Sequence, residues 1–187
     1  MKKKMFAAAF AATLALALAA PLAAQERGGT LKFARYDGSK LVDPIYAERN
    51  PDIWMVGSLY STLLEWGRDG SGLTGALAET FSQSSDGKTI DITLRDGIRF
   101  SDGSPVTAAD VVFSLDRARN PDLSPWAGLL GAISGVTGEG PKVTISLSRP
   151  DPTILSMLAT FNTAIVSRTA FEKAPGATDQ EKSAALF

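Results

Sequence analysis

The 187-residue sequence contains no cysteine and no histidine. Without cysteine, the chain has no thiolate nucleophile, no cysteine-ligated zinc and no disulfide. Without histidine, it lacks the commonest transition-metal ligand and the usual general base near neutral pH. A mechanism based on aspartate and glutamate, or a site for a hard cation, remains possible, but the range of catalytic chemistry is narrow.

The sequence also has no excess of positive charge, because 19 basic residues stand against 20 acidic ones. With 44% apolar residues, it is typical of a globular chain rather than a disordered one. The length suits one domain or two small ones. Residues 25–187 alone, without Lys2–Lys4, contain 16 basic and 20 acidic residues. This negative balance argues against a nucleic-acid partner.

The first 24 residues have the layout of a secretory signal peptide. Lys2–Lys4 form a basic start, and the next 20 residues, Met5–Ala24, carry no charge. An uncleaved membrane anchor is the alternative, because about 20 apolar residues can span a bilayer. However, the run is rich in alanine, and Pro21 interrupts it near its end. We therefore predict cleavage after Ala24 and export of residues 25–187.

Alternating apolar and polar residues predict two β-hairpins. The alternation over Thr89–Leu94 indicates a half-buried strand, preceded by a short strand over Thr80–Gln83. The Asp86-Gly87 pair between them is a strong turn signal. A second hairpin is expected from residues 129–136 and 142–148, and further strands from residues 30–35 and 164–167.

Apolar residues at helical spacing predict the main helices. Asn50 is a suitable N-cap before Pro51, and the residues that follow indicate a helix to about Thr62. Thr107 and Asp110 match a capping box at the start of another helix. Further helices are expected after Asp151-Pro152 and over residues 169–174, followed by a polar tail, and Trp54 and Trp66 are expected in the core.

The acidic residues between Asp86 and Asp110 suggest a metal loop, a catalytic carboxylate pair or turns that lead into a helix. Asp102-Gly103 matches a turn in which the aspartate bonds to nearby backbone and the glycine takes a positive φ. The spacing of Asp96, Asp102 and Asp110 does not match the alternating acidic ligands of a calcium loop. We interpret these residues as turn and cap residues, with a metal or catalytic site as the weaker alternative.

Residues 77–118 resemble the signature of the family 5 extracellular solute-binding proteins, the peptide, dipeptide and nickel class of ABC transporters. Between Leu94 and Ser114 the sequence reads LRDGIRFSDGSPVTAADVVFS. It contains each part of that signature: Leu-Arg-x-Gly, Phe-x-Asp-Gly-x-Pro, Thr-Ala-x-Asp-Val and Phe-Ser. Similar upstream stretches, such as Leu59–Gly70, extend the resemblance over essentially all of residues 25–187.

The resemblance implies an α/β fold of the periplasmic-binding-protein type II class. Because family members are longer, residues 25–187 are expected to be the N-terminal part of lobe I, with a mixed sheet, hairpins and flanking helices and without the second lobe. It also implies a periplasmic, monomeric and non-enzymatic protein without cofactor or metal. Its expected partners are oligopeptides, dipeptides or a related small solute, and the ABC permease subunits in the membrane.

The resemblance places ligand contacts in the loop after the first strand and in a loop after the signature helix. In this sequence those positions are Tyr36, Asp37 and Gly38, and Trp126. A plain turn for the first group and ordinary packing for Trp126 are the alternatives. Two other functions remain open, namely a fragment without binding activity and a secreted hydrolase with paired carboxylates. The sequence does not separate peptide from nickel, opine or sugar as the solute.

Overall fold

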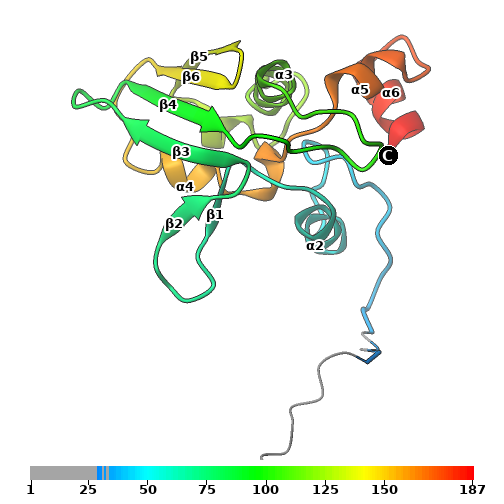
Figure 1. Cartoon of the computed structure of the whole chain (residues 1–187). Coiled ribbons are helices and arrows are strands. Elements are labelled where there is room, and N and C mark those ends of the chain that lie inside the picture. The colour runs from blue at the N-terminus through cyan, green and yellow to red at the C-terminus, as the bar shows by residue number, and fades with distance from the viewer. Residues whose placement is uncertain (1–28, 31, 33) are drawn as a thin grey trace, which may run out of the picture. The chain divides into compact units, whose positions relative to one another are not determined.

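The computed structural model describes residues 29, 30, 32 and 34–187. It divides into one unit of residues 1–34 and another of residues 35–187, and all described helices and strands belong to the second (Figure 1). The predicted signal peptide, residues 1–24, lies outside the described residues. So do residues 31 and 33 of the strand predicted over residues 30–35. The other four residues of that segment are not in a strand, because side-chain alternation alone supplies no hydrogen-bonding neighbour.

Residues 35–187 combine short strands with short helices. The strands are β1 (Leu64–Trp66), β2 (Leu73–Gly75), β3 (Ala78–Gln83), β4 (Thr89–Leu94), β5 (Ile133–Glu139) and β6 (Lys142–Leu147). The α-helices are α2 (Asn50–Leu59), α3 (Ala108–Ala118), α4 (Ile154–Met157), α5 (Arg168–Lys173) and α6 (Asp179–Leu186), and the 3₁₀ helices are η1 (Ala127–Leu130) and η2 (Phe161–Thr163).

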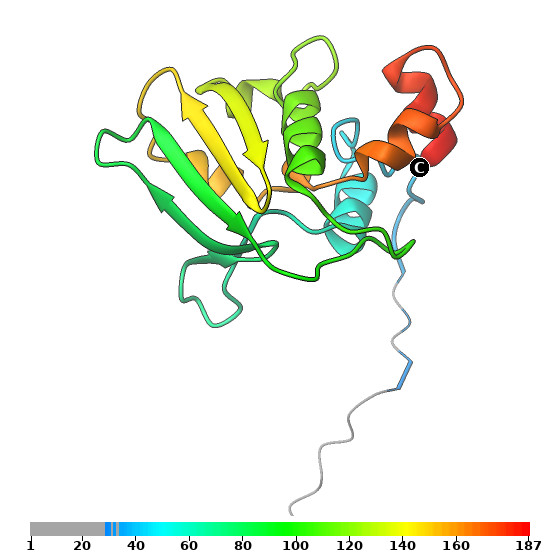
Figure 2. The same ribbon diagram turned by 45° about the horizontal axis from the view of Figure 1, so that its top comes forward.

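Four of the strands form one sheet in the order β3-β4-β6-β5 (Figure 2). Both predicted hairpins are confirmed, with turns at Asp86-Gly87 and Gly140-Pro141. Every described pair in the sheet is antiparallel, whereas the expectation was for a mixed sheet. For the β3–β4 and β5–β6 pairs the reason is that tight hairpins can join only antiparallel strands, while a parallel pair needs a longer crossover. The strands β1 and β2 pair separately, also antiparallel.

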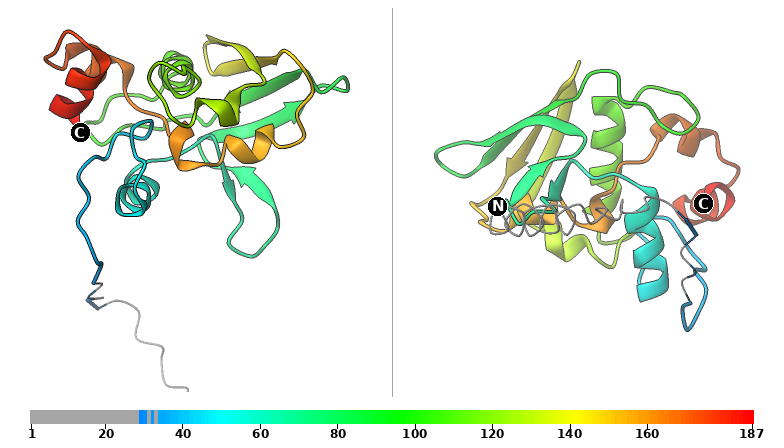
Figure 3. Two further views of the ribbon diagram at one scale, coloured as in Figure 1. Left: turned by 180° about the vertical axis from the view of Figure 1, so that it is seen from behind. Right: turned by 60° about the horizontal axis from the view of Figure 1, so that its bottom comes forward.

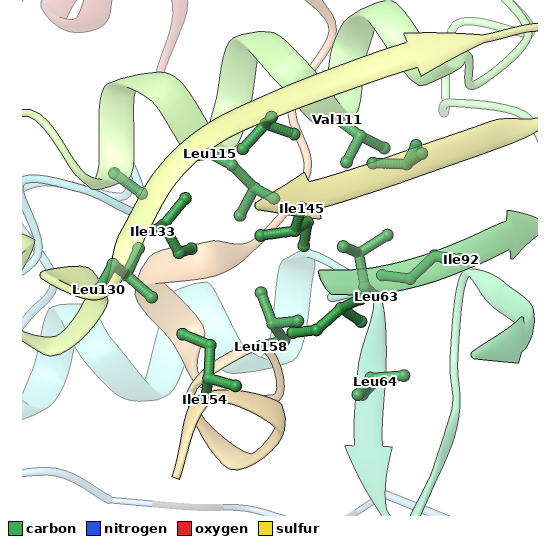
Figure 4. Packing of buried hydrophobic residues seen from close by; sticks show 14 of the residues in the cluster. Leu63, Leu64, Ile92, Val111, Leu115, Leu130, Ile133, Ile145, Ile154 and Leu158 are labelled. Carbon is green, nitrogen blue, oxygen red and sulfur yellow. The ribbon is translucent and has the colours of Figure 1, made fainter. Parts of the chain in front are cut away.

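The helix α3 packs its apolar stripe against the buried face of this sheet (Figure 4). Its predicted start is confirmed, because Thr107 is the N-cap and Asp110 completes a capping box. Val111 and Leu115 are fully buried among apolar residues of β4 and β6, such as Ile92 and Ile145. Burying such side chains stabilises the fold by about 1.5–3 kcal/mol each. The sheet and α3 therefore share the apolar core of residues 35–187.

A close approach between β5 and α3 explains one glycine in the sheet. A Cβ atom at Gly138 would lie 2.6 Å from the Cβ of Ala108, the first residue of α3. No larger side chain fits this position without moving the helix away from the strand. The start of α3, and with it the loop that leads into the helix, is thus held close to the sheet.

Several local predictions around α2 are wrong. The helix ends at Leu59, and its N-cap is Arg49 rather than Asn50. Trp54 and Trp66, expected in the core, are 51% and 59% exposed. Both sequence positions are apolar, but only the neighbouring elements decide which side of a short helix or strand is covered.

The C-terminal part differs from its prediction in two places. Residues 164–167 are extended and mostly buried but do not form a strand, because their amides donate to separate partners: Ile165 to the Ser61 carbonyl and Val166 to the Ser114 hydroxyl. The segment expected to be a polar tail contains the helix α6. Its capping box at Thr178 and Glu181 was present in the sequence as a Thr-x-x-Glu signal.

The views in Figures 1 and 3 place α5 and α6 at one end of residues 35–187, with the β3–β4 turn at the other. The predicted helix α5 is confirmed, whereas the helix predicted after Pro152 is the single-turn α4. In the part of the chain that the structure describes, none of the helices has both the length and the apolar character needed to span a membrane.

Candidate functional site

The predicted ligand loop, Tyr36–Gly38, lies on the surface and is held by its acidic residue. The Asp37 carboxylate accepts the Gly38 N–H at 2.8 Å and forms an ion pair with Arg49. Tyr36 is 79% exposed, more than any other large apolar or aromatic side chain in residues 35–187. The chain bends at Tyr36 and Asp37, and the loop presents an aromatic side chain to solvent.

Asp52 anchors the chain after this loop to the start of α2. Its carboxylate is 3% exposed and accepts the Lys40 N–H at 2.7 Å, the Leu41 N–H at 3.3 Å and the Ser39 hydroxyl at 2.9 Å. Burial alone would raise the pKa of Asp52, but these hydrogen bonds outweigh it and lower the pKa below its usual value. The carboxylate therefore stays ionised and holds the loop in place.

Trp126, the other predicted ligand residue, lies just before η1 and is half-buried. Its indole N–H donates to the Ala47 carbonyl at 2.9 Å, and its ring meets Phe161 edge to face, with 5.3 Å between centroids. Part of the Trp126 ring is therefore used in packing within the protein. The same short segment of chain contacts both predicted parts of the site, because Ala47 binds Trp126 and Arg49 binds Asp37.

A buried ion cluster holds the chain just before the Ala47–Arg49 segment. Arg117 of α3 is 5% exposed and donates to Asp43 at 2.8 Å and to Asp179 at 2.6 Å and 2.9 Å. The Tyr46 hydroxyl donates to Asp179 at 3.0 Å, and the Arg117 guanidinium lies 4.1 Å from the Phe171 ring centroid. Burial opposes the charge on Arg117, but its hydrogen bonds to Asp179 and Asp43 outweigh this and raise its pKa. Arg117 is 74 positions from Asp43 and 62 positions from Asp179, so no local pattern in the sequence predicted the cluster.

The signature loop, residues 98–106, is stabilised by hydrogen bonds within its own backbone. The Val106 N–H donates to the Ile98 carbonyl at 3.1 Å, and the Phe100 N–H donates to the Ser104 carbonyl at 2.8 Å. Gly103 has a φ of 85°, in the left-handed region that a glycine adopts without strain. The Asp102 carboxylate accepts the N–H and the hydroxyl of Ser104, at 2.8 Å and 2.6 Å, which confirms its predicted role in the turn.

Asp110 likewise has the structural role that the sequence predicted. Its carboxylate accepts the Thr107 N–H at 2.8 Å, the Thr107 hydroxyl at 2.6 Å and the Arg168 N–H at 2.8 Å. The third bond, which was not predicted, ties the start of α5 to the start of α3. Within the residues that the structure describes, no cluster of three acidic side chains could hold a metal ion.

A pocket of about 440 Å³ opens beside the signature loop. We call it the signature pocket. Its walls come from five segments: the end of α2, Leu77 just before β3, the signature loop, the segment that leads into α5, and the end of α6. They include Phe100, Val106, Ile165 and Phe187. Arg99 and Asp102 lie among these apolar residues, together with three serines. Sequence reasoning missed this pocket, because it forms only where five separate segments meet.

Solved structures with this fold are periplasmic binding proteins. The binding protein MoaA of A. tumefaciens R10, solved in complex with mannopinic acid, gives a TM-score of 0.68 at 30% identity, over 73% of this chain and 29% of MoaA. The murein tripeptide binding protein MppA of Escherichia coli gives 0.66 at 27% identity, over 74% of this chain and 31% of MppA. The predicted periplasmic-binding-protein fold class is thus confirmed.

The sequence then identifies the family within this class. The sequence pattern of the bacterial extracellular solute-binding proteins, family 5 (middle region), matches residues 72–185, so the chain belongs to this family. The glutathione-binding protein GsiB of Salmonella typhi is 38% identical over 99 residues, which are 52% of this chain and 19% of GsiB. The chain spans about a fifth of the length of the curated relatives it matches.

Proposed function

We propose that the chain is the solute-binding component of an ABC importer. In this proposal residues 1–24 are a signal peptide, and residues 25–187 act in the periplasm as the N-terminal part of the protein's first lobe. The family match over residues 72–185 carries the proposal. The basic start and the uncharged run of Met5–Ala24 support export.

We propose oligopeptides or dipeptides as the solute. Two similar proteins are described as binding glutathione and a murein tripeptide, which are both peptides. Others are described with different solutes: MoaA with mannopinic acid, and NikA of Staphylococcus aureus with a nickel–histidine complex.

Tyr36, Asp37, Gly38 and Trp126 are the proposed ligand contacts in this part of the protein. The exposed ring of Tyr36 offers an apolar wall that tolerates many sequences. An extended peptide forms hydrogen bonds through its backbone, and we expect it to pair with backbone groups of this loop other than the Gly38 N–H, which bonds to Asp37. The part of the Trp126 ring that Phe161 does not cover would form a second wall.

In this function the protein carries its solute to the permease subunits as a monomer and does not change it chemically. The carboxylates that a hydrolase would need to pair are engaged elsewhere: Asp102 bonds to Ser104 in a turn, and Asp110 caps α3. Asp110 is also only 5% exposed, so its carboxylate is not available to pair with a second one across an open cleft, as glycoside hydrolysis requires.

Isothermal titration of the full chain with a peptide library tests the proposal. Binding of at least some peptides is expected, and Tyr36→Ala should weaken it. Trp66→Ala is the matched control, because Trp66 is also exposed but lies in the separate β1–β2 pair. Hydrogen exchange run in parallel reports whether the chain is folded. A protected chain that binds no peptide, or loses affinity equally in both variants, would contradict the proposal.

A further inference from the structure

The signature pocket is built like a binding site for a small organic molecule. Its volume of about 440 Å³ lies within the range of about 300–1,000 Å³ that is typical of ligand sites. Such sites combine mostly apolar walls with a few fixed polar groups, and the signature pocket has both. It lies at the C-terminal end of α2, whereas the Tyr36–Gly38 loop is anchored at the N-terminal end of that helix, where Arg49 forms an ion pair with Asp37.

The apolar part of the pocket suits an apolar side chain. Ile165 is 4% exposed and forms part of the floor, and Leu77, Phe100 and Val106 are partly buried around it. At the rim, Leu59 and Leu186 are 57% and 38% exposed. An apolar group that enters the pocket would cover these exposed carbon atoms and gain the hydrophobic free energy of that burial.

Two oppositely charged side chains, Arg99 and Asp102, line the pocket, and both belong to the signature loop. The Arg99 guanidinium donates to the Gly103 carbonyl at 2.8 Å, and the Asp102 Oδ1 atom accepts both bonds from Ser104. These contacts hold both side chains in place, and each side chain still has hydrogen-bonding groups that these contacts do not use. Among the described residues, neither forms an ion pair with the other or with a third residue. The Ser104 bonds also lower the pKa of Asp102, so it remains ionised at neutral pH.

We propose that the signature pocket binds a short peptide with free termini, with an apolar side chain inside the pocket, the ammonium group at Asp102 and the carboxylate at Arg99. Opposite charges on one rim complement a ligand that carries a carboxylate and an ammonium group together with an apolar body. The three serines of the pocket, among them Ser61 and Ser167, offer hydroxyls to peptide groups. This inference rests on the proposed function and adds to it a preference for peptides with a large apolar residue.

Filling the pocket tests the apolar part of the proposal. Ala170 of α5 lines the pocket, and its neighbour Thr169 is exposed and does not. Ala170→Phe should lower the affinity for the peptide Ala-Phe-Ala by roughly tenfold or more, the loss expected when a large apolar side chain is no longer buried. Thr169→Phe adds the same ring to the same helix outside the pocket and should leave the affinity unchanged. Isothermal titration of the full chain measures both, and circular dichroism checks the fold.

Neutralising one charge tests the polar part without filling the pocket. Asp102→Asn should weaken binding of Ala-Phe-Ala by about fivefold, but not binding of its N-acetylated form, which has no ammonium group. Asp86→Asn is the matched control, because Asp86 makes the same kind of turn contacts, to Ser84 and Lys88, and does not line the pocket.

The outcomes separate this inference from the proposed function. If wild-type protein binds Ala-Phe-Ala no more tightly than Ala-Ala-Ala, or if Ala170→Phe and Thr169→Phe behave alike, the pocket does not select an apolar residue and the inference is wrong. Peptide binding, and with it the proposed function, would survive that result. If the folded wild-type chain binds neither peptide, the proposed peptide function fails and the inference fails with it.

Discussion

Arg117 in α3 and Arg99 in the signature loop are 18 positions apart, and the two regions use the same side chain in different ways. Arg117 is 5% exposed, and its donors reach Asp43 and Asp179. Arg99 is exposed, and its hydrogen bond goes to the carbonyl of Gly103, four residues away. The first arginine joins three segments that are distant in sequence, whereas the second stabilises only its own loop.

The difference lies in what each charge has available after folding. A buried charge must find its partners inside the protein, because leaving it unpaired costs several kcal/mol. An exposed charge is solvated by water and can exchange that water for a ligand. The buried cluster therefore belongs to the framework of the fold, whereas the exposed charges at the rim of the signature pocket are available to the solute that we propose. Four measurements sharpen or break this distinction.

The largest effect is expected from Arg117→Leu. This change leaves Asp43, which is fully buried, without its cation, and we expect a loss of about 3–5 kcal/mol in the free energy of unfolding. Arg119→Leu is the control, because its ion pair with Asp116 is partly exposed and should contribute less than about 1 kcal/mol. Urea denaturation measures both. Similar losses in the two variants would remove the distinction between framework and surface charges.

A smaller loss in the free energy of unfolding is expected from Asp110→Ala. Asp110 is 5% exposed and caps α3 while it also binds the Arg168 N–H, so its removal should cost about 1–3 kcal/mol. Asp102→Ala should destabilise the protein less, because its carboxylate is exposed and bonds only within its turn. Thermal unfolding of both variants tests this order, and the reverse order would show that the signature turn matters more to the fold than the cap.

The buried cluster should also make stability depend on alkaline pH. Burial, reinforced by the charge of Asp179 nearby, raises the pKa of Tyr46 to about 12. In the unfolded chain a tyrosine loses its proton near pH 10, so its contribution to stability is complete below pH 10 and is lost as the pH rises through 12. In Tyr46→Phe the fall in the free energy of unfolding between pH 9 and 12 should be shallower. An unchanged slope would show that Tyr46 is not coupled to the cluster.

The smallest effect on stability is expected from Arg99→Gln. Because Arg99 is exposed and its hydrogen bond is local, the free energy of unfolding should change by no more than about 0.5 kcal/mol. Urea denaturation provides the measurement. A loss approaching that of Arg117→Leu would mean that Arg99 supports the fold and is not left available to a ligand.

Local sequence signals predicted the hairpins and α3 well. Asp-Gly at positions 86 and 87 with alternating residues over Thr89–Leu94, and the Thr107–Asp110 box, are each complete within a few residues. Neighbours along the chain set these structures, because turn geometry and helix capping involve only nearby backbone groups. The same holds for Asp102, whose role in its turn required nothing beyond Gly103 and Ser104.

The candidate site was less predictable. The resemblance pointed to Tyr36–Gly38 and Trp126, and the structure shows that both contact the segment Ala47–Arg49. It did not point to the signature pocket or to the α6 helix that closes one side of it. Trp54 and Trp66 were expected inside and lie outside, because apolar character alone does not tell which residues find a neighbouring element to cover them.

The sequence by itself determined the turns, the hairpins, the start of α3 and, through the signature, the family. Each of these depends on residues close together in the chain, or on a pattern that can be read in order. The tertiary structure alone decided the Asp43–Arg117–Asp179 cluster, the exposed tryptophans and the signature pocket. Those features arise where segments far apart in sequence meet, and packing and charge pairing across such distances have no local signal along the chain.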